Sequence, residues 1–126
     1  MIVLDTHALL WWVGSPKHLG KAALAAIEST DAIGVPAIVF WEVALLTRLE
    51  RIALDRPVMD WVEVVLSVPR VTSLPLTPSI AVRADGLDMH ADPADRFIVA
   101  TAIEHRSKIA TKDKALRRLR SVGTVW

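Results

Sequence analysis

The chain has 126 residues, of which 52% are hydrophobic and 23% charged, as expected for one globular domain rather than a disordered segment. Its 15 basic and 14 acidic residues leave a formal charge of +1, whereas simple nucleic-acid binders usually carry a clear positive excess. The absence of cysteine excludes disulfides and thiolate chemistry, and the four histidines lack the spacing of a zinc cluster. Any chemistry must therefore use carboxylates, hydroxyls or basic groups.

Short apolar runs alternate along the chain with segments of helical spacing. From the N-terminus, we expect a strand at Met1–Leu4, helices at His7–Val13 and Leu19–Ile27, a strand at Asp31–Val35 and a helix at Pro36–Leu49. There follow a helix at Pro57–Leu66, a strand at Val71–Leu76, a helix starting at Thr77-Pro78, a helix from Asp92 to about Arg106, a strand at Lys108–Thr111, a basic helix at Asp113–Arg120 and a closing strand at Val122–Trp126. This alternation predicts an α/β fold with a mostly parallel sheet.

No segment points to a second domain or to a membrane. The apolar runs are shorter than the roughly 18 residues that span a bilayer, and the first residues carry neither a basic leader nor an apolar signal segment. There is no internal repeat and no linker. We therefore expect residues 1–126 to form one domain of a cytoplasmic protein.

Two acidic residues follow directly on predicted strands. Asp5 comes after the first strand, and Asp113 follows the strand that ends at Thr111. In open α/β sheets, ligands bind at the carboxyl ends of the strands, near the point where the strand order reverses. Each aspartate also suits a simpler role at the start of the next helix, as a cap or as a favourable charge.

Glu42 is the only ionisable residue in the apolar run from Ile38 to Leu46. A helix that is apolar on all sides is normally buried, and a buried glutamate needs a partner. That partner is either a basic side chain elsewhere in the chain or a bound cation, and we favour the cation.

The segment Asp92-Pro93-Ala94-Asp95 has the pattern of a helix start. Asp92 suits the N-cap, and Asp95 stands where the second acid of a capping box would be. Asp95 also precedes the apolar run Phe97–Ala100, which places it at the rim of a cavity. His90, just upstream, is expected to hydrogen-bond the turn before Asp92.

Together these acids predict a site for a hard cation. If the first and fourth strands are neighbours, then Asp5, Glu42, Asp95 and Asp113 converge at one end of the sheet. Carboxylate oxygens without cysteine or clustered histidine suit Mg²⁺ or Mn²⁺. Such an ion favours phosphodiester hydrolysis, and the sequence has no glycine-rich phosphate loop that would indicate a nucleotide-binding enzyme.

Four segments resemble the PIN-domain ribonucleases, and in particular the VapC toxins of VapBC toxin–antitoxin pairs. They are Ile2–Trp11 (IVLDTHALLW), Trp41–Ala44 (WEVA), His90–Ala102 (HADPADRFIVATA) and Ile109–Asp113 (IATKD). Their order and spacing cover almost the whole chain. The resemblance implies a PIN-like three-layer α/β/α sandwich and a metal-dependent endoribonuclease acting as a toxin.

Position by position, the resemblance makes Asp5, Glu42, Asp95 and Asp113 the catalytic, metal-holding quartet. It gives Thr6 and Thr111 supporting roles in orienting carboxylates or waters, and it gives Arg96 a structural salt bridge. It also implies an RNA substrate, a VapB-like antitoxin and a homodimer. Relatives typically have serine near the start of the helix that carries the glutamate, where this chain has Ala37 and Val39.

Other functions compete with this interpretation. The chain could be a non-catalytic PIN-like module that binds RNA or protein, or a receiver-like domain that accepts phosphate on an aspartate. The second is less favoured, because Thr6 rather than another acid follows Asp5. Residues alone do not separate RNA cleavage from DNA cleavage, and RNA is preferred on the resemblance.

The near-zero net charge is the sum of an acidic candidate site and an excess of basic residues in the rest of the chain. Setting the four site acids aside from the 14 acidic residues leaves ten against 15 basic ones, an excess of five positive charges. Much of this excess lies between Arg106 and Arg120. The stretch is either a solvated helix face or a contact surface for a phosphate backbone, with Lys112, Lys114 and Arg117 as the candidate RNA contacts.

Overall fold

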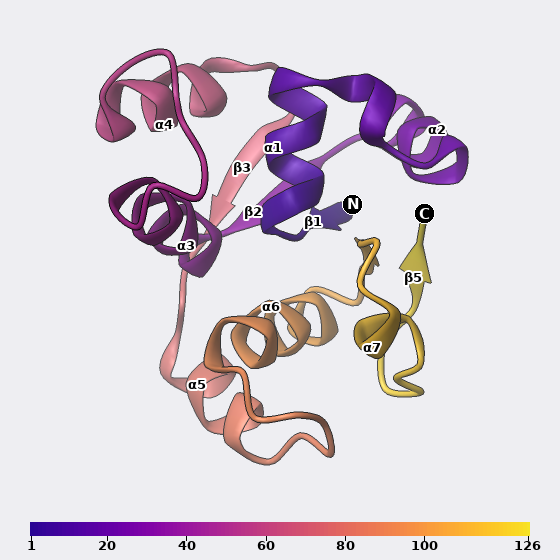
Figure 1. Cartoon of the computed structure of the whole chain (residues 1–126). Coiled ribbons are helices and arrows are strands. Elements are labelled where there is room, and N and C mark those ends of the chain that lie inside the picture. The colour runs from indigo at the N-terminus through magenta and orange to yellow at the C-terminus, as the bar shows by residue number, and fades with distance from the viewer.

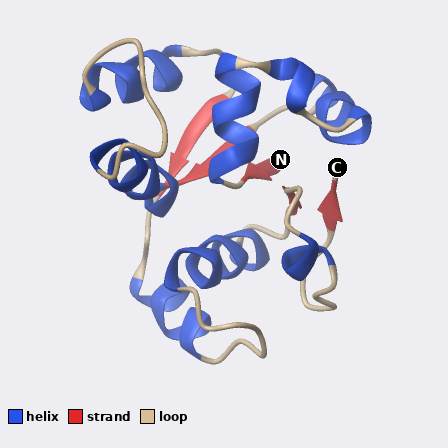
Figure 2. Cartoon of the chain, viewed as in Figure 1, coloured by secondary structure: helices blue, strands red, loops and turns tan.

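The computed structural model describes all residues from Met1 to Trp126, and it consists of one five-stranded sheet between two layers of helices. The strands are β1 (Ile2–Leu4), β2 (Ile33–Pro36), β3 (Val71–Leu74), β4 (Lys108–Ala110) and β5 (Thr124–Val125). The helices are α1 (Thr6–Gly14), η1 (Pro16–His18), α2 (Lys21–Ser29), α3 (Ala37–Arg48), α4 (Val58–Ser67), α5 (Pro78–Asp85), α6 (Pro93–Glu104) and α7 (Lys114–Arg117). The predicted three-layer α/β/α sandwich is confirmed (Figure 2).

All strand pairs are parallel, in the order β3-β2-β1-β4-β5. The chain moves outward from β1 to β3 and then returns to the other side of β1. Right-handed crossovers therefore place α1 and α2 on one face and α5 and α6 on the other (Figure 1). The strand order reverses between β1 and β4, where Val3 pairs with Ile109. The expected neighbourhood of the first and fourth strands is thus confirmed.

The core lies between the sheet and both helical layers. The neighbouring strands β1 and β4 are largely buried on both faces, with Val3, Leu4, Ile109 and Ala110 fully inaccessible and only Lys108 exposed at the start of β4, which explains their apolar residues. None of the helices combines the length and the apolar character needed to cross a membrane.

Helix α3 departs from the expectation that it is buried all round. Only Val39 and Val43 are fully buried, whereas the Trp41 side chain is 55% exposed. The helix packs against α1, α4, α6 and β2, and Trp41 and Arg48 are its exposed residues. Its apolar sequence therefore reflects an uncovered surface as well as a core contact.

The basic helix is shorter than predicted. It covers Lys114–Arg117 rather than Asp113–Arg120, with Asp113 outside it as the N-cap. Only Leu116 anchors it in the core, and extending the helix to Arg120 would place like charges at helical spacing, Lys114 with Arg118 and Arg117 with Arg120. Strands β3 and β5 likewise end short of the predicted Val71–Leu76 and Val122–Trp126.

Candidate functional site

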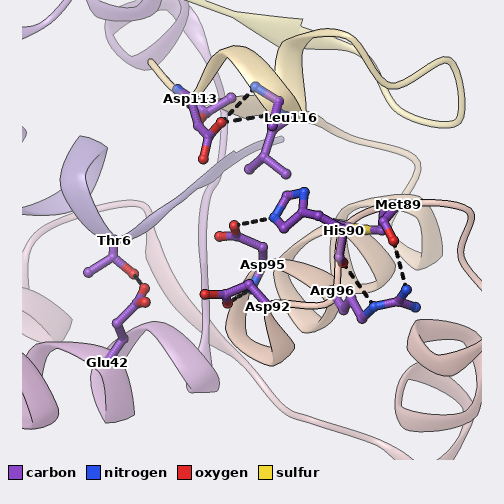
Figure 3. A network of polar contacts seen from close by, with 11 residues as sticks. Thr6, Glu42, Met89, His90, Asp92, Asp95, Arg96, Asp113 and Leu116 are labelled. Atoms are coloured by element: carbon purple, nitrogen blue, oxygen red, sulfur yellow. Dashed lines mark hydrogen bonds and ion pairs between the residues drawn. The ribbon is translucent and has the colours of Figure 1, made fainter.

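An acidic cleft lies at the carboxyl ends of β1 and β4, where the strand order reverses. Its volume is about 550 Å³. Five acidic side chains line it, namely Asp5, Glu42, Asp92, Asp95 and Asp113. Figure 3 shows Glu42 of α3, Asp95 of α6 and Asp113, just before α7, extending toward the same space. The structure therefore brings together all four acids singled out in the sequence, and it adds Asp92 as a fifth.

Asp5 lies deepest in this cleft. Only 9% of the residue is exposed, and its backbone N–H donates to the carbonyl of Ala110 on β4 at 3.3 Å. Its Oδ1 accepts from the Ala8 N–H at 2.9 Å, so it also caps α1. Burial raises the pKa of Asp5 to about 6, although a hydrogen bond with the Thr111 side chain and the cap at Ala8 oppose this effect. The cap and the site roles are therefore combined in one residue.

Glu42 reaches the cleft from α3 and meets Thr6 of α1. The Thr6 hydroxyl donates to Glu42 Oε1 (Figure 3), and no lysine or arginine pairs with this carboxylate. Burial raises the pKa of Glu42, the hydrogen bond from Thr6 lowers it, and the charge of Asp95 adds to the increase. Glu42 thus receives its one hydrogen bond from Thr6 on the neighbouring helix, and not from a residue of α3.

Asp95 stands on the first turn of α6, where only half of the expected capping box forms. The Asp95 N–H donates to Asp92 Oδ1 at 3.1 Å, which confirms Asp92 as the N-cap. The Asp95 carboxylate does not reach back to complete the box. Its Oδ2 lies 2.7 Å from His90 Nε2 instead. Burial raises the pKa of Asp95, and the His90 contact lowers it.

His90 therefore contacts Asp95 and not the turn before Asp92, where we expected it. The sequence contains no periodic signal for this contact, because the four residues between His90 and Asp95 cross an irregular segment and a helix start.

Asp113 completes the acidic lining from the start of α7. Its Oδ1 accepts from the Ala115 N–H at 2.7 Å and from the Leu116 N–H at 3.4 Å. The Thr111 hydroxyl accepts from the Asp113 N–H at 3.1 Å and so helps to shape the turn after β4. The remaining carboxylate oxygen of Asp113 makes no hydrogen bond within the chain.

Arg96 forms no salt bridge, contrary to the expectation from the resemblance. Its guanidinium donates to backbone carbonyls of the segment that joins α5 to α6. These carbonyls belong to Ala84, Asp85, Leu87, Met89 and His90. A planar guanidinium carries five donors in a fixed arrangement, which suits it to several convergent carbonyls as well as to a carboxylate.

The three candidate RNA contacts lie in α7 and in the turn before it. Lys112 lines the cleft itself, and its Nζ lies 5.6 Å from the ring centroid of Trp11. Lys114 and Arg117 are exposed on α7. None of the three forms an ion pair within the chain.

The donor set fits a hard divalent cation. Five carboxylates line one cleft, together with only two basic side chains, those of Lys112 and His7. Burial disfavours the charged forms of three of these acids. No group of three acidic or histidine side chains converges on a single point. A cation held here would therefore take part of its ligand shell from water, as Mg²⁺ commonly does.

Comparison with known proteins agrees with this geometry. The model of the PIN domain family matches residues 2–122. The chain is 42% identical to Ribonuclease VapC22 of Mycobacterium tuberculosis, in a match that covers 99% of this chain and 98% of that protein.

Solved structures share the fold at lower identity. A DNA-bound VapBC from Salmonella typhimurium has a TM-score of 0.71 at 15% identity, covering 98% of this chain and 95% of that one. A DNA-bound VapBC2 from Rickettsia felis has a TM-score of 0.70 at 16% identity, covering 98% and 97%. The fold, the family match and the full-length similarity agree, and the chain belongs to the PIN-domain family, among its VapC-type members.

Proposed function

We propose that residues 1–126 form one catalytic domain, a metal-dependent endoribonuclease that acts as the toxin of a toxin–antitoxin pair in the cytoplasm. The observation that carries this proposal is the acidic cleft, where carboxylates from four separate elements meet without an arginine or lysine partner. The 42% identity to a named ribonuclease over nearly the whole chain supports RNA as the substrate.

Asp5, Glu42, Asp95 and Asp113 are the proposed holders of the cation. The match to the PIN domain family supports a divalent metal ion, and the all-oxygen donor set of this cleft supports Mg²⁺ or Mn²⁺. When bound, such an ion offsets charge on the scissile phosphate and makes an attacking water more acidic.

The other residues of the cleft have supporting roles in this proposal. Thr6 and Thr111 hold Glu42 and Asp5 in place through their hydroxyls. Lys112 lines the cleft and offers a positive charge to a phosphate of the RNA backbone. Lys114 and Arg117, exposed on α7, extend this contact to neighbouring phosphates.

An antitoxin similar to VapB is the proposed protein partner, and a homodimer is the proposed assembly. The solved structures that share the fold include toxin–antitoxin complexes. A second cleft, of about 620 Å³, is lined mainly by apolar side chains and adjoins the acidic one, because His7 and Trp11 line both. The exposed side chains of Trp41, Met59 and Val82 offer further apolar surface for association.

The direct test is incubation of the purified protein with total RNA and with DNA, in the presence and absence of Mg²⁺ or Mn²⁺. We expect cleavage of RNA that EDTA abolishes and that Asp95→Asn removes. Asp88→Asn serves as the control, because Asp88 is exposed and its side chain makes no hydrogen bond. Full cleavage by Asp95→Asn, or cleavage that resists EDTA, would overturn the proposal.

The same experiment separates the alternative, a non-catalytic binding module. Such a module would bind RNA without cutting it, and a Mn²⁺ titration would change neither its melting temperature nor any activity.

A further inference from the structure

His90 is held from both sides. Its backbone carbonyl accepts from Arg96 Nε at 3.1 Å, and its ring nitrogen Nε2 lies 2.7 Å from Asp95 Oδ2 (Figure 3). An ionised carboxylate can only accept a hydrogen bond, so the ring donates its Nε2–H. One residue therefore links the guanidinium of Arg96 to a carboxylate of the acidic cleft.

The segment that carries His90 depends on Arg96 for its shape. Between the end of α5 at Asp85 and the start of α6 at Pro93 the backbone is irregular. The Arg96 guanidinium binds its carbonyls at Leu87 (3.1 Å) and Met89 (2.8 Å) in addition to that of His90. Backbone carbonyls without regular structure need such partners, and these bonds place the imidazole beside the cleft.

The consequence for Asp95 is a defined orientation. Its backbone N–H is fixed by the Asp92 cap at 3.1 Å, and its Oδ2 is engaged by His90. The other oxygen, Oδ1, makes no hydrogen bond within the chain and is left for the cleft. Carboxylates that bind metals are commonly oriented by hydrogen bonds from outside the ligand shell, and loss of such a bond weakens metal affinity about 10- to 100-fold.

We propose that His90 is a positioning residue that orients the Asp95 carboxylate for cation binding, and that Arg96 acts on the cation through His90. The proposal rests on the function proposed above, since it concerns the same acidic cleft. In this proposal Arg96 contributes to the site without forming a salt bridge and without contacting the substrate.

The test measures Mn²⁺ affinity by calorimetric or electron paramagnetic resonance titration, together with the melting temperature, and without using activity. We expect His90→Ala to weaken Mn²⁺ binding about tenfold. His90→Gln, whose amide can place a donor close to the position of Nε2, should restore most of the affinity. His105→Ala is the matched control, because this exposed histidine follows the other end of α6 and should leave the affinity unchanged.

Arg96→Lys, made alone and in the His90→Ala background, tests the link between the two residues. We expect the single substitution to weaken Mn²⁺ binding, because one ammonium group cannot hold all the carbonyls of the segment. In the His90→Ala background the same change should lower the melting temperature without weakening Mn²⁺ binding further.

Three outcomes would overturn the proposal. They are an unchanged Mn²⁺ affinity in His90→Ala, no recovery in His90→Gln, and additive effects of the two substitutions. If the wild-type protein cleaves RNA with Mn²⁺ and one of these results is found, only the positioning role fails. If the wild-type protein binds no Mn²⁺ at all, the metal-dependent function and the positioning role both fail.

Discussion

Asp5→Asn is expected to stabilise the metal-free protein at neutral pH while abolishing its activity. The buried carboxyl has a pKa of about 6, against an ordinary value of 3.8. Because the folded state holds this proton more tightly than the unfolded chain does, the free energy of unfolding falls as the pH rises from about 4 to above 6. At about 1.4 kcal/mol per pH unit of difference, the ionised group destabilises the folded state by about 3 kcal/mol at pH 8. Asparagine carries no charge and caps helices about as well as aspartate.

The assay is urea denaturation of both proteins in EDTA at pH 8 and at pH 4. The difference in free energy of unfolding between Asp5→Asn and the wild type should approach about 3 kcal/mol at pH 8 and become small at pH 4. The two proteins are compared with each other at each pH, so the titration of all other groups largely cancels in the difference. Asp88→Asn, at an exposed position, should change stability by no more than roughly 0.5 kcal/mol.

A difference that does not vary with pH would refute this reasoning, as would a variant less stable than the wild type at pH 8. Either result would show that the cleft does not hold Asp5 as an uncompensated charge.

A further measurement links stability to the site. Mn²⁺ should raise the melting temperature of the wild type at pH 8, because a ligand that binds only the folded state stabilises it, and it should have a much smaller effect on Asp5→Asn.

Three more substitutions probe the surroundings of the cleft. Thr6→Val removes the donor to Glu42, so the pKa of Glu42 should rise further and the acidic limb of the pH–rate profile should move to higher pH. Lys112→Ala should weaken RNA binding and reduce the salt dependence of the binding constant by about one counterion, measured by fluorescence anisotropy at several salt concentrations. Gly20→Ala should lower the melting temperature, because a Cβ there would overlap the backbone carbonyl carbon of Trp126.

Each of these has a matched control. Thr6→Ser keeps the hydroxyl and should retain the wild-type pH profile. Lys21→Ala removes an exposed charge on α2, and equal losses of RNA affinity in this variant and in Lys112→Ala would argue against a specific contact. Gly86→Ala places its Cβ no closer than 3.7 Å to another atom. If it destabilised the chain as much as Gly20→Ala does, the close approach of Trp126 would not be the cause.

The sequence alone predicted most of the elements and four of the five acids that line the cleft. Apolar runs and helical spacing depend on neighbours within a few residues, so the strands and helices were predicted close to their observed bounds. Glu42 stood out because a charge within an apolar helix is rarely tolerated without a partner. Asp5 and Asp113 stood out because each follows a strand. The main local difference is the basic helix, which ends at Arg117 rather than Arg120, because like charges three and four residues apart on a helix repel one another.

Tertiary structure decided which groups meet. Only the pairing of β1 with β4 brings Asp5 and Asp113 to the same edge of the sheet. The hydroxyl of Thr6 donates to Glu42, which lies 36 residues further along the chain. The guanidinium of Arg96 donates to backbone carbonyls, where a carboxylate was expected. The exposure of α3 was equally invisible in its sequence. The preference of a segment for helix or strand depends on short-range sterics and on its own apolar pattern. Hydrogen-bond partners and the burial of a charged side chain depend on how distant segments pack, and a short stretch of sequence does not contain that information.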